Sequence, residues 1–283
     1  ASDVYKRQEQ GIKYLSKSKM KRKLIAIFAM VTLLGSYHGY AQSTATGPNK
    51  VYIEQVGSSN TLTIEQVGGT NMVGGVTETS KTVSNTNVTT LVPTEPSATN
   101  YGTITGSTNT LAITQQGNNN SAQYNIKGNN NGYTSTVVGN NNQTQLNIGD
   151  TNNANNLRNS VTEVITGNGN LSYLNLVGSD ITSSVTMTGD SNQVVKDLKS
   201  SNGTSTIGIT GSNNILYAQQ IDSAGANGHT LVQNIFGDYN SITTQQQGSN
   251  DTNVNISTTG SHNTITVRSS SSTIATPLTA VAR

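Results

Sequence analysis

Side-chain amides are the groups in this chain whose type and spacing could do chemistry. In residues 54–71, which read EQVGSSNTLTIEQVGGTN, Gln55 and Asn60 are repeated eleven positions later as Gln66 and Asn71. An amide both donates and accepts hydrogen bonds, so identical amides at a fixed period can bond to one another along a stack. This spacing therefore predicts ladders between stacked repeats rather than a reaction at one site.

The predicted ladder and turn residues share a Gln-x-Gly-x-x-Asn pattern, complete or degenerate. The glycines allow a positive φ at each turn, and Asn tolerates the left-handed region. The residues are Gln55, Gly57, Asn60, Gln66, Gly68, Asn71, Asn109, Gln115, Gly117, Asn120, Gly128, Asn131, Gly139, Asn142, Gln246 and Gly248.

The titratable residues do not form the pattern of an active or metal site. His38 lies in a predicted leader, and His229 and His262 fall at or beside turns with no second ligand at metal spacing. The acidic residues occur singly along the repeats, without the paired carboxylates that a hydrolase needs. The glycine-rich turns lack the Gly-Lys-Ser/Thr ending of a phosphate loop. We therefore expect no catalytic residue, no metal and no cofactor in this chain.

Short strands of equal length must position the amides. Apolar residues alternate within each repeat, as at Leu62 and Ile64 or Leu111 and Ile113, which is typical of a strand with one buried face. Each strand ends in a short Gly-x-x-Asn arc. Units of eleven residues are predicted to begin at Asn49, Asn60, Asn71, Asn109, Asn120, Asn131, Asn142, Asn159, Asn170, Ile181, Asn192, Gly203, Asn214, His229, Asn240, Thr252 and Asn263.

One unit cannot bury its own apolar face, whereas two units facing each other can. The predicted fold is therefore all-β: a β-solenoid of two-strand coils, about 22 residues each, stacked in parallel and in register. We expect about nine to eleven coils from the chain length and this repeat. Longer steps between units predict loops that bulge from a coil, the largest being an irregular insertion over about 74–97.

The N-terminal region has the form of a secretory signal peptide, predicted over 20–41. Lys21, Arg22 and Lys23 precede the apolar stretch Leu24–Gly35, which is too short to span a bilayer. Residues 1–19 are expected to be a non-native or untranslated upstream segment. Residues 42–268 form the predicted repeat region, and 269–283 a C-terminal tail or cap.

Charge and cysteine content narrow the possible partners. Residues 42–283 hold eight Lys/Arg and twelve Asp/Glu, a net charge of −4, although the whole chain is +2. With no basic patch, nucleic acid is not an expected partner, and no membrane span is expected after signal removal. Because the chain has no Cys, hydrogen bonding and packing rather than disulfides must hold the repeats together.

The stretch from Gln55 to Asn71 resembles the curlin repeat of curli-type bacterial amyloid subunits. The same motif is matched by Gln115, Gly117 and Asn120, and in part by Gln246 and Gly248. The resemblance implies a secreted subunit of extracellular cross-β fibres that serve biofilm matrix and surface adhesion. It also implies an outer-membrane secretion pore, accessory chaperones and a related major or nucleating subunit as partners, besides further copies of this chain.

A second function class stays open at this point. A monomeric, capped β-solenoid adhesin would use the insertions as binding loops, and the C-terminal segment with Pro277 could cap one end. An ice-binding face would need columns of outward Thr. The pairs Thr61/Thr63, Thr204/Thr206 and Thr264/Thr266 fit such columns, but the units between them do not.

Two charged residues fall at positions that should face inward, Glu163 and Lys196. They are three units apart, which places them on opposite walls of adjacent coils. Either they interact inside the solenoid, or local bulges turn both outward. The cost of burying an unpaired charge favours the outward arrangement.

Overall fold

The computed structural model describes most of the repeat region. Residues 1–46 lie outside the described residues, and so do the predicted signal peptide and upstream segment. The backbone is described for residues 47–83, 86–93, 101–149, 158–199, 201–222, 228–248, 252–270 and 279–281. Side chains are not described for 76–93, 221–222, 247–248, 269–270 and 279–281.

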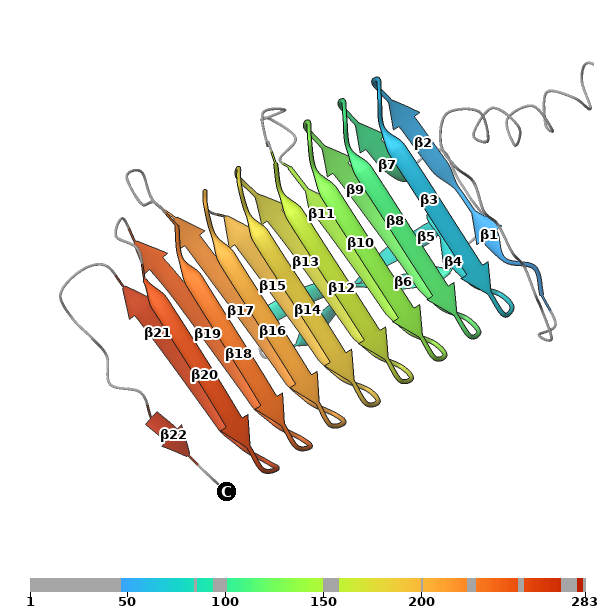
Figure 1. The fold of residues 1–283 in the computed structure, drawn as a ribbon. Coiled ribbons are helices and arrows are strands. Elements are labelled where there is room, and N and C mark those ends of the chain that lie inside the picture. Colours follow the sequence, from blue (N-terminus) through green and yellow to red (C-terminus); the bar gives the residue numbers. More distant parts are fainter. Residues whose placement is uncertain are drawn as a thin grey trace, which may run out of the picture.

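Two parallel sheets form the walls of a β-solenoid, which confirms the predicted fold class (Figure 1). Sheet A contains β1 (Lys50–Val51), β2 (Ile53–Val56), β4 (Met72–Val73), β7 (Gly102–Thr105), β9 (Ser121–Lys127), β11 (Gln143–Ile148), β13 (Leu171–Val177), β15 (Gln193–Lys199), β17 (Ile215–Asp222), β19 (Ser241–Gly248), β21 (Thr264–Ser270) and β22 (Thr279–Val281). Sheet B contains β3 (Thr61–Val67), β8 (Thr110–Gln116), β10 (Gly132–Val138), β12 (Ser160–Thr166), β14 (Thr182–Thr188), β16 (Thr204–Thr210), β18 (Thr230–Phe236) and β20 (Asn253–Thr259).

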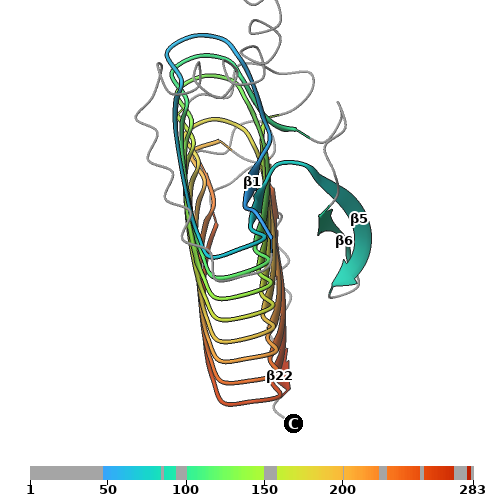
Figure 2. The same ribbon diagram turned by 90° about the vertical axis from the view of Figure 1, so that its right-hand side faces the viewer.

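The chain alternates between the walls, so each coil is one strand of sheet A and one of sheet B. The end-on view shows the coils as a stack of flattened rings (Figure 2). Stacking is parallel and in register, with Leu111 aligned to Leu62 and Tyr133 to Leu111. Each predicted unit start lies at the same place, one residue before its strand.

The described residues form eight complete coils and a ninth level of sheet A, because β1 with β2 and β4 with β7 each share a level. The expectation of nine to eleven coils was therefore too high. The chain leaves sheet A after Val73 and returns at Gly102, so residues 71–106 supply a single unit. Nine levels at ~4.8 Å span about 38 Å between the first and the last.

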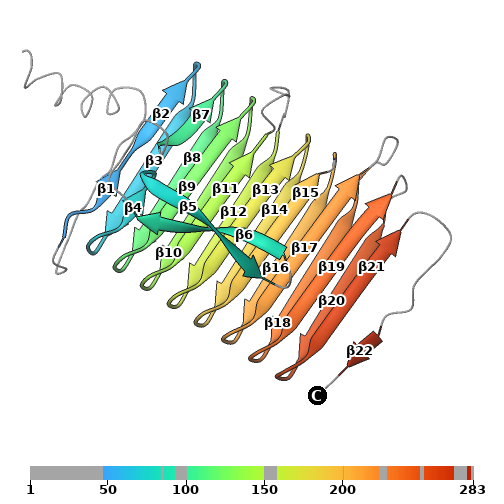
Figure 3. The same ribbon diagram turned by 180° about the vertical axis from the view of Figure 1, so that it is seen from behind.

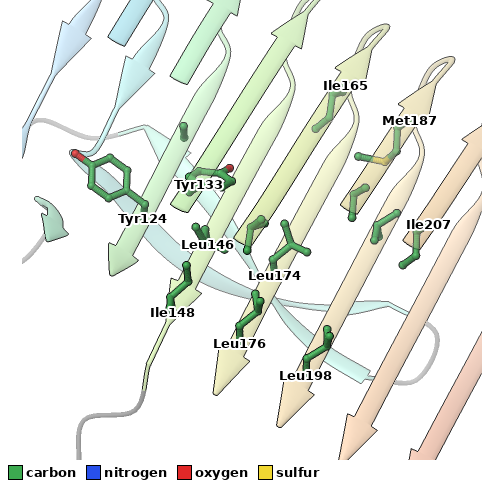
Figure 4. Close-up of a cluster of buried hydrophobic side chains, with 14 of the residues drawn as sticks. Tyr124, Tyr133, Leu146, Ile148, Ile165, Leu174, Leu176, Met187, Leu198 and Ile207 are labelled. Atoms are coloured by element: carbon green, nitrogen blue, oxygen red, sulfur yellow. The ribbon is translucent and has the colours of Figure 1, made fainter. Parts of the chain in front are cut away.

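Apolar residues from both walls fill the space between the sheets. Inward side chains align from coil to coil, as Leu146 with Leu174 and Ile148 with Leu176. All four are fully buried, and Figure 4 shows them beside inward residues of sheet B such as Ile165 and Met187. This core is continuous along the rod, so each coil is stabilised by the coils on either side.

The segment between Val73 and Gly102 includes an antiparallel hairpin of β5 (Val76–Val83) and β6 (Thr86–Pro93). It crosses the outer surface of sheet A, over β9, β11, β13 and β17 (Figure 3). We call this outer surface face A, and that of sheet B face B. Outward residues of face A are buried where the hairpin crosses it: Gln123, Gln145, Leu171 and Val195.

Longer connections are confined to one side of the rod. They occur inside sheet A, or where the chain passes from sheet A to sheet B, as between Ile148 and Ser160. All eight passages from sheet B to sheet A have the same Gly-x-x-Asn length. Consequently, face B and the edge beside it are regular along the whole rod.

The C-terminal segment contributes one short strand. β22 pairs antiparallel with Thr264–Thr266 of β21, at the end of sheet A. Sheet B has no such additional strand among the described residues, where β20 and β3 each have a single neighbour. In the part of the chain that the structure describes, no helix is long and apolar enough to cross a membrane.

Candidate functional site: amide ladders and two buried charges

Nine Asn residues form an unbroken column where the chain enters sheet A. Eight consecutive hydrogen bonds join each backbone N–H to the Oδ1 of the Asn one coil earlier. The column consists of Asn49, Asn71, Asn120, Asn142, Asn170, Asn192, Asn214, Asn240 and Asn263. We call it the A ladder, and its regularity means that one coil specifies the position of the next.

Each amide inside the A ladder uses its donors and its acceptor. At Asn120, the backbone N–H and Nδ2 donate to Asn71 Oδ1 at 3.0 and 3.1 Å, and Nδ2 also donates to Gly139 O at 2.8 Å. Asn120 Oδ1 in turn accepts from the N–H and Nδ2 of Asn142. Since these groups are buried, each unmade bond would cost ~1–3 kcal/mol.

The corresponding column at the entrance to sheet B is shorter. Asn60, Asn109, Asn131 and Asn159 repeat the same backbone-to-Oδ1 bond, and Ile181 N–H donates to Asn159 Oδ1 at 2.9 Å. The later positions are Gly203, His229 and Thr252. There the backbone pairing continues, and His229 Nδ1 contacts Thr252 Oγ1 at 2.8 Å. The two halves of the rod therefore differ along this edge.

A further polar ladder runs along the sheet-B-to-sheet-A arcs, outside the core. In each of seven steps a backbone N–H donates to the side chain at the second arc position one coil later. The accepting residues are Asn118, Asn140, Asn168, Asp190, Ser212, Asp238 and Ser261. This explains why single acidic residues follow strands here: carboxylate, amide and hydroxyl oxygens all satisfy the same N–H.

Glycine is required at the arcs for two reasons: a side chain would clash with the next arc, and the backbone φ is positive. Gly117 has φ of 119°, and a Cβ there would lie 2.0 Å from the carbonyl oxygen of Gly139 in the next coil. The third arc residue is left-handed, as at Asn119 with φ of 57°. The predicted turn glycines thus permit close stacking of successive arcs.

The glutamine ladders are short. Gln66 Nε2 donates to Gln115 Oε1 at 2.8 Å, and Gln220 Nε2 donates to Gln246 Oε1 at 2.8 Å. Gln55 is exposed and aligned with Ile104, so it has no Gln neighbour in register. Gly248 ends β19, and its surroundings lie outside the described side chains.

Glu163 is buried on the sheet B wall and faces the core. Its Oε2 accepts hydrogen bonds from Tyr133 Oη at 2.7 Å and from Ser135 Oγ at 3.2 Å, both on the preceding coil. Burial raises the pKa of Glu163, and the surrounding hydroxyls oppose part of that change. Burial, and then the carboxylate beside it, raise the pKa of Tyr133.

Lys196 is buried on the opposite wall, one coil further on. Its Nζ donates to Ser183 Oγ at 3.1 Å and to the carbonyl oxygens of Ser184 and Ser205 at 3.0 and 3.2 Å. These three acceptors satisfy the three donors of an ammonium group. Burial nevertheless lowers the pKa of Lys196 to about 7, although the charge of Glu163 acts in the opposite direction.

The expectation that Glu163 and Lys196 turn outward was wrong. Hydroxyl and carbonyl groups on neighbouring coils give each a local set of partners, which reduces the cost that favoured exposure. The ion pairs among the described residues are Arg158–Asp180 and Lys199–Asp197, so the two buried groups interact through their electric fields without a direct bridge.

The described residues contain no group of three or more His, Cys, Asp or Glu arranged to hold a metal ion. Comparisons with protein-family models, curated proteins and solved structures found no match. The proposed function therefore rests on the geometry of the solenoid. Its main features are two uncharged polar ladders, a continuous core and strand edges that face along the rod axis.

Proposed function

We propose that this chain is a secreted subunit that polymerises end to end into an extracellular cross-β fibre, for biofilm matrix and surface adhesion. Both a major and a nucleating subunit are compatible with this role. By its resemblance to curli-type subunits, the expected partners are further copies, a related subunit, an outer-membrane secretion pore and accessory chaperones.

The observation that carries the proposal is the repetition of one stacking interface at every level. Each coil presents backbone donors and acceptors, ladder amides and apolar residues in the register that the next coil needs. Within the described residues, sheet B ends at β3 and β20, each with one strand neighbour. Unpaired edges of this kind template the addition of another strand.

The outward edge of β20 supplies a specific test. Thr230 N–H donates to Thr252 O, and Gly260 N–H donates to Phe236 O. In a parallel ladder, the N–H groups of Asn255 and Ser257 therefore point away from β18. A proline at 257 would remove an outward donor and leave the bonds to β18 intact.

The experiment follows thioflavin-T fluorescence of residues 42–283, with fibre diffraction on the product. Seedable growth and reflections near ~4.7 and ~10 Å are expected. Ser257→Pro should slow elongation from wild-type seeds by roughly tenfold or more, while Ser257→Ala should elongate normally. A soluble, cooperatively melting wild-type monomer that shows no growth over days would contradict the proposal.

The alternative is a monomeric, capped surface adhesin. The antiparallel pairing of β22 with β21 favours it, because an antiparallel strand interrupts the parallel stack at that end of sheet A. Deletion of residues 271–283 distinguishes the two functions. It should accelerate growth if β22 only hinders stacking, and should cause non-fibrillar aggregation or unfolding if β22 is a structural cap.

A further inference from the structure

The two broad faces of the rod differ in what covers them. On face A, the hairpin crosses several strands, and Val195 is packed among Tyr173, Ile215 and Tyr217. Face A also carries charged residues such as Lys127 and Asp197. On face B the side chains of the middle coils, including Thr134, Thr162 and Thr206, are exposed.

Face B is flat, carries mostly short side chains and is nearly uncharged. Its outward positions are mostly Thr, Ser, Val and Gly, repeated in register over eight strands. Glu65, in the first of these strands, is the single outward charge on them, since Glu163 faces the core. Phe236 and Val164 add exposed apolar surface. Short β-branched side chains on a flat sheet can interdigitate with a matching sheet.

We propose that face B packs against face B of a second copy of this chain. The size fits: eight strands at ~4.8 Å and seven residues at ~3.3 Å give about 38 by 23 Å, or roughly 900 Å². Stable interfaces typically bury about 800 Å² per partner. A two-fold axis perpendicular to the rod would also place the two Glu65 carboxylates near opposite ends of the interface, because Glu65 lies in the first strand of face B.

Charge selects this face over the rest of the surface. Residues 42–283 carry a net charge of −4, so two copies repel each other in general. Face B holds almost none of that charge and desolvates without burying ions. The hairpin occupies the corresponding surface of sheet A, which leaves one broad face for lateral contact. The pairing is lateral, so it does not depend on end-to-end growth.

Sedimentation velocity of freshly prepared residues 42–283, before seeded growth begins, tests the pairing separately from end growth. A dimer is expected. Thr162→Arg with Thr206→Arg should weaken dimerisation roughly 100-fold or more, because both charges would be buried without partners. Val177→Arg is the matched control: Val177 lies on face A, aligned with Lys199, and its replacement should leave the dimer intact.

Cross-linking provides a second measurement that does not depend on the arginine variants folding. The natural chain has no Cys, so Thr186→Cys places a single thiol near the centre of face B, and Val177→Cys places one on face A. Mild oxidation should cross-link the first and not the second.

A monomeric wild type, a dimer that survives both arginines, or cross-linking through residue 177 alone would overturn the proposal. A monomer that inhibits ice recrystallisation would also overturn it, and would assign the Thr array to ice.

Discussion

Gly102 leaves the space that the ring of Tyr124 fills in the next coil. A Cβ at residue 102 would lie 2.6 Å from Cζ of Tyr124, a side chain with no exposed surface. The two residues share an inward position on adjacent strands of sheet A. The insertion therefore returns to the solenoid at a glycine because its neighbour is large.

Gly102→Ala should destabilise the rod by about 1–3 kcal/mol through overpacking. The measurement is urea unfolding followed by circular dichroism. In a Tyr124→Leu background the same alanine should cost less, because the smaller side chain makes room. Equal costs in the two backgrounds would show that the contact does not set the size of residue 102.

Removing one amide from the A ladder should lower the unfolding free energy substantially. Asn142→Ala would leave the donors of Asn170 and the carbonyl of Gly167 without a side-chain partner. We expect a loss of about 2–4 kcal/mol in unfolding free energy, from unsatisfied buried groups. Asn234→Ala on face B is the control and should stay within about 0.5 kcal/mol of wild type. Similar losses for both variants would contradict a special role for the ladder.

Lys196 should make stability rise with pH above neutrality. Its pKa falls from 10.5 to about 7 on folding, so between these values the unfolded chain binds more protons than the folded chain. Unfolding free energy should therefore increase by a few kcal/mol from about pH 7 to 10. Thermal or urea melts of Lys196→Met should lose that increase. An unchanged pH dependence would mean that residue 196 is not its source.

Glu163 should produce the opposite slope in acid. Its pKa is raised on folding from 4.5, so above pH 4.5 the folded chain retains a proton that the unfolded chain has released. Stability should fall as the pH rises from 4.5 towards the folded pKa of Glu163. Melts of Glu163→Gln should lack this fall, and a fall of the same size in the variant would contradict the assignment.

Excision of residues 75–101 should restore a regular unit. Val73, Gly74 and Gly102 would then be consecutive and occupy the positions that Ala122, Gln123 and Tyr124 fill in the next coil. We expect the shortened chain to keep its strand content and to bind more of a hydrophobic dye, because Leu171 and Val195 lose their cover. Loss of the cooperative melt would show that the hairpin is needed for folding.

The sequence predicted the strand starts well because Gly-x-x-Asn is both a turn signal and a ladder signal. It indicated an irregular insertion over about 74–97 but did not predict the hairpin, because the residues between Val76 and Val83 are all polar and show no apolar alternation. The arc ladder through Asn118 and Asp190 was missed for another reason. Asn, Asp and Ser look unrelated in sequence, although each offers one oxygen at the same place.

The inward direction of Glu163 had a detectable signal. Ser135 occupies the corresponding inward position one coil earlier in sheet B, and Tyr133 stands two residues before it. Two hydroxyls beside a carboxylate indicate a buried polar cluster rather than a bulge. The inward direction of Lys196 had a weaker sequence signal. Its partners include the backbone carbonyls of Ser184 and Ser205, which residue types do not reveal.

The A ladder gives the rod a direction. From Asn71 to Asn263, every Oδ1 that takes part accepts from the coil that follows it in sequence, so the amide carbonyl dipoles add along the axis. Strand backbones lack this property, because their carbonyls alternate. An inverted coil would oppose two amide oxygens. Any extension of the stack must therefore preserve its polarity, and each single stack of coils would have two chemically different ends.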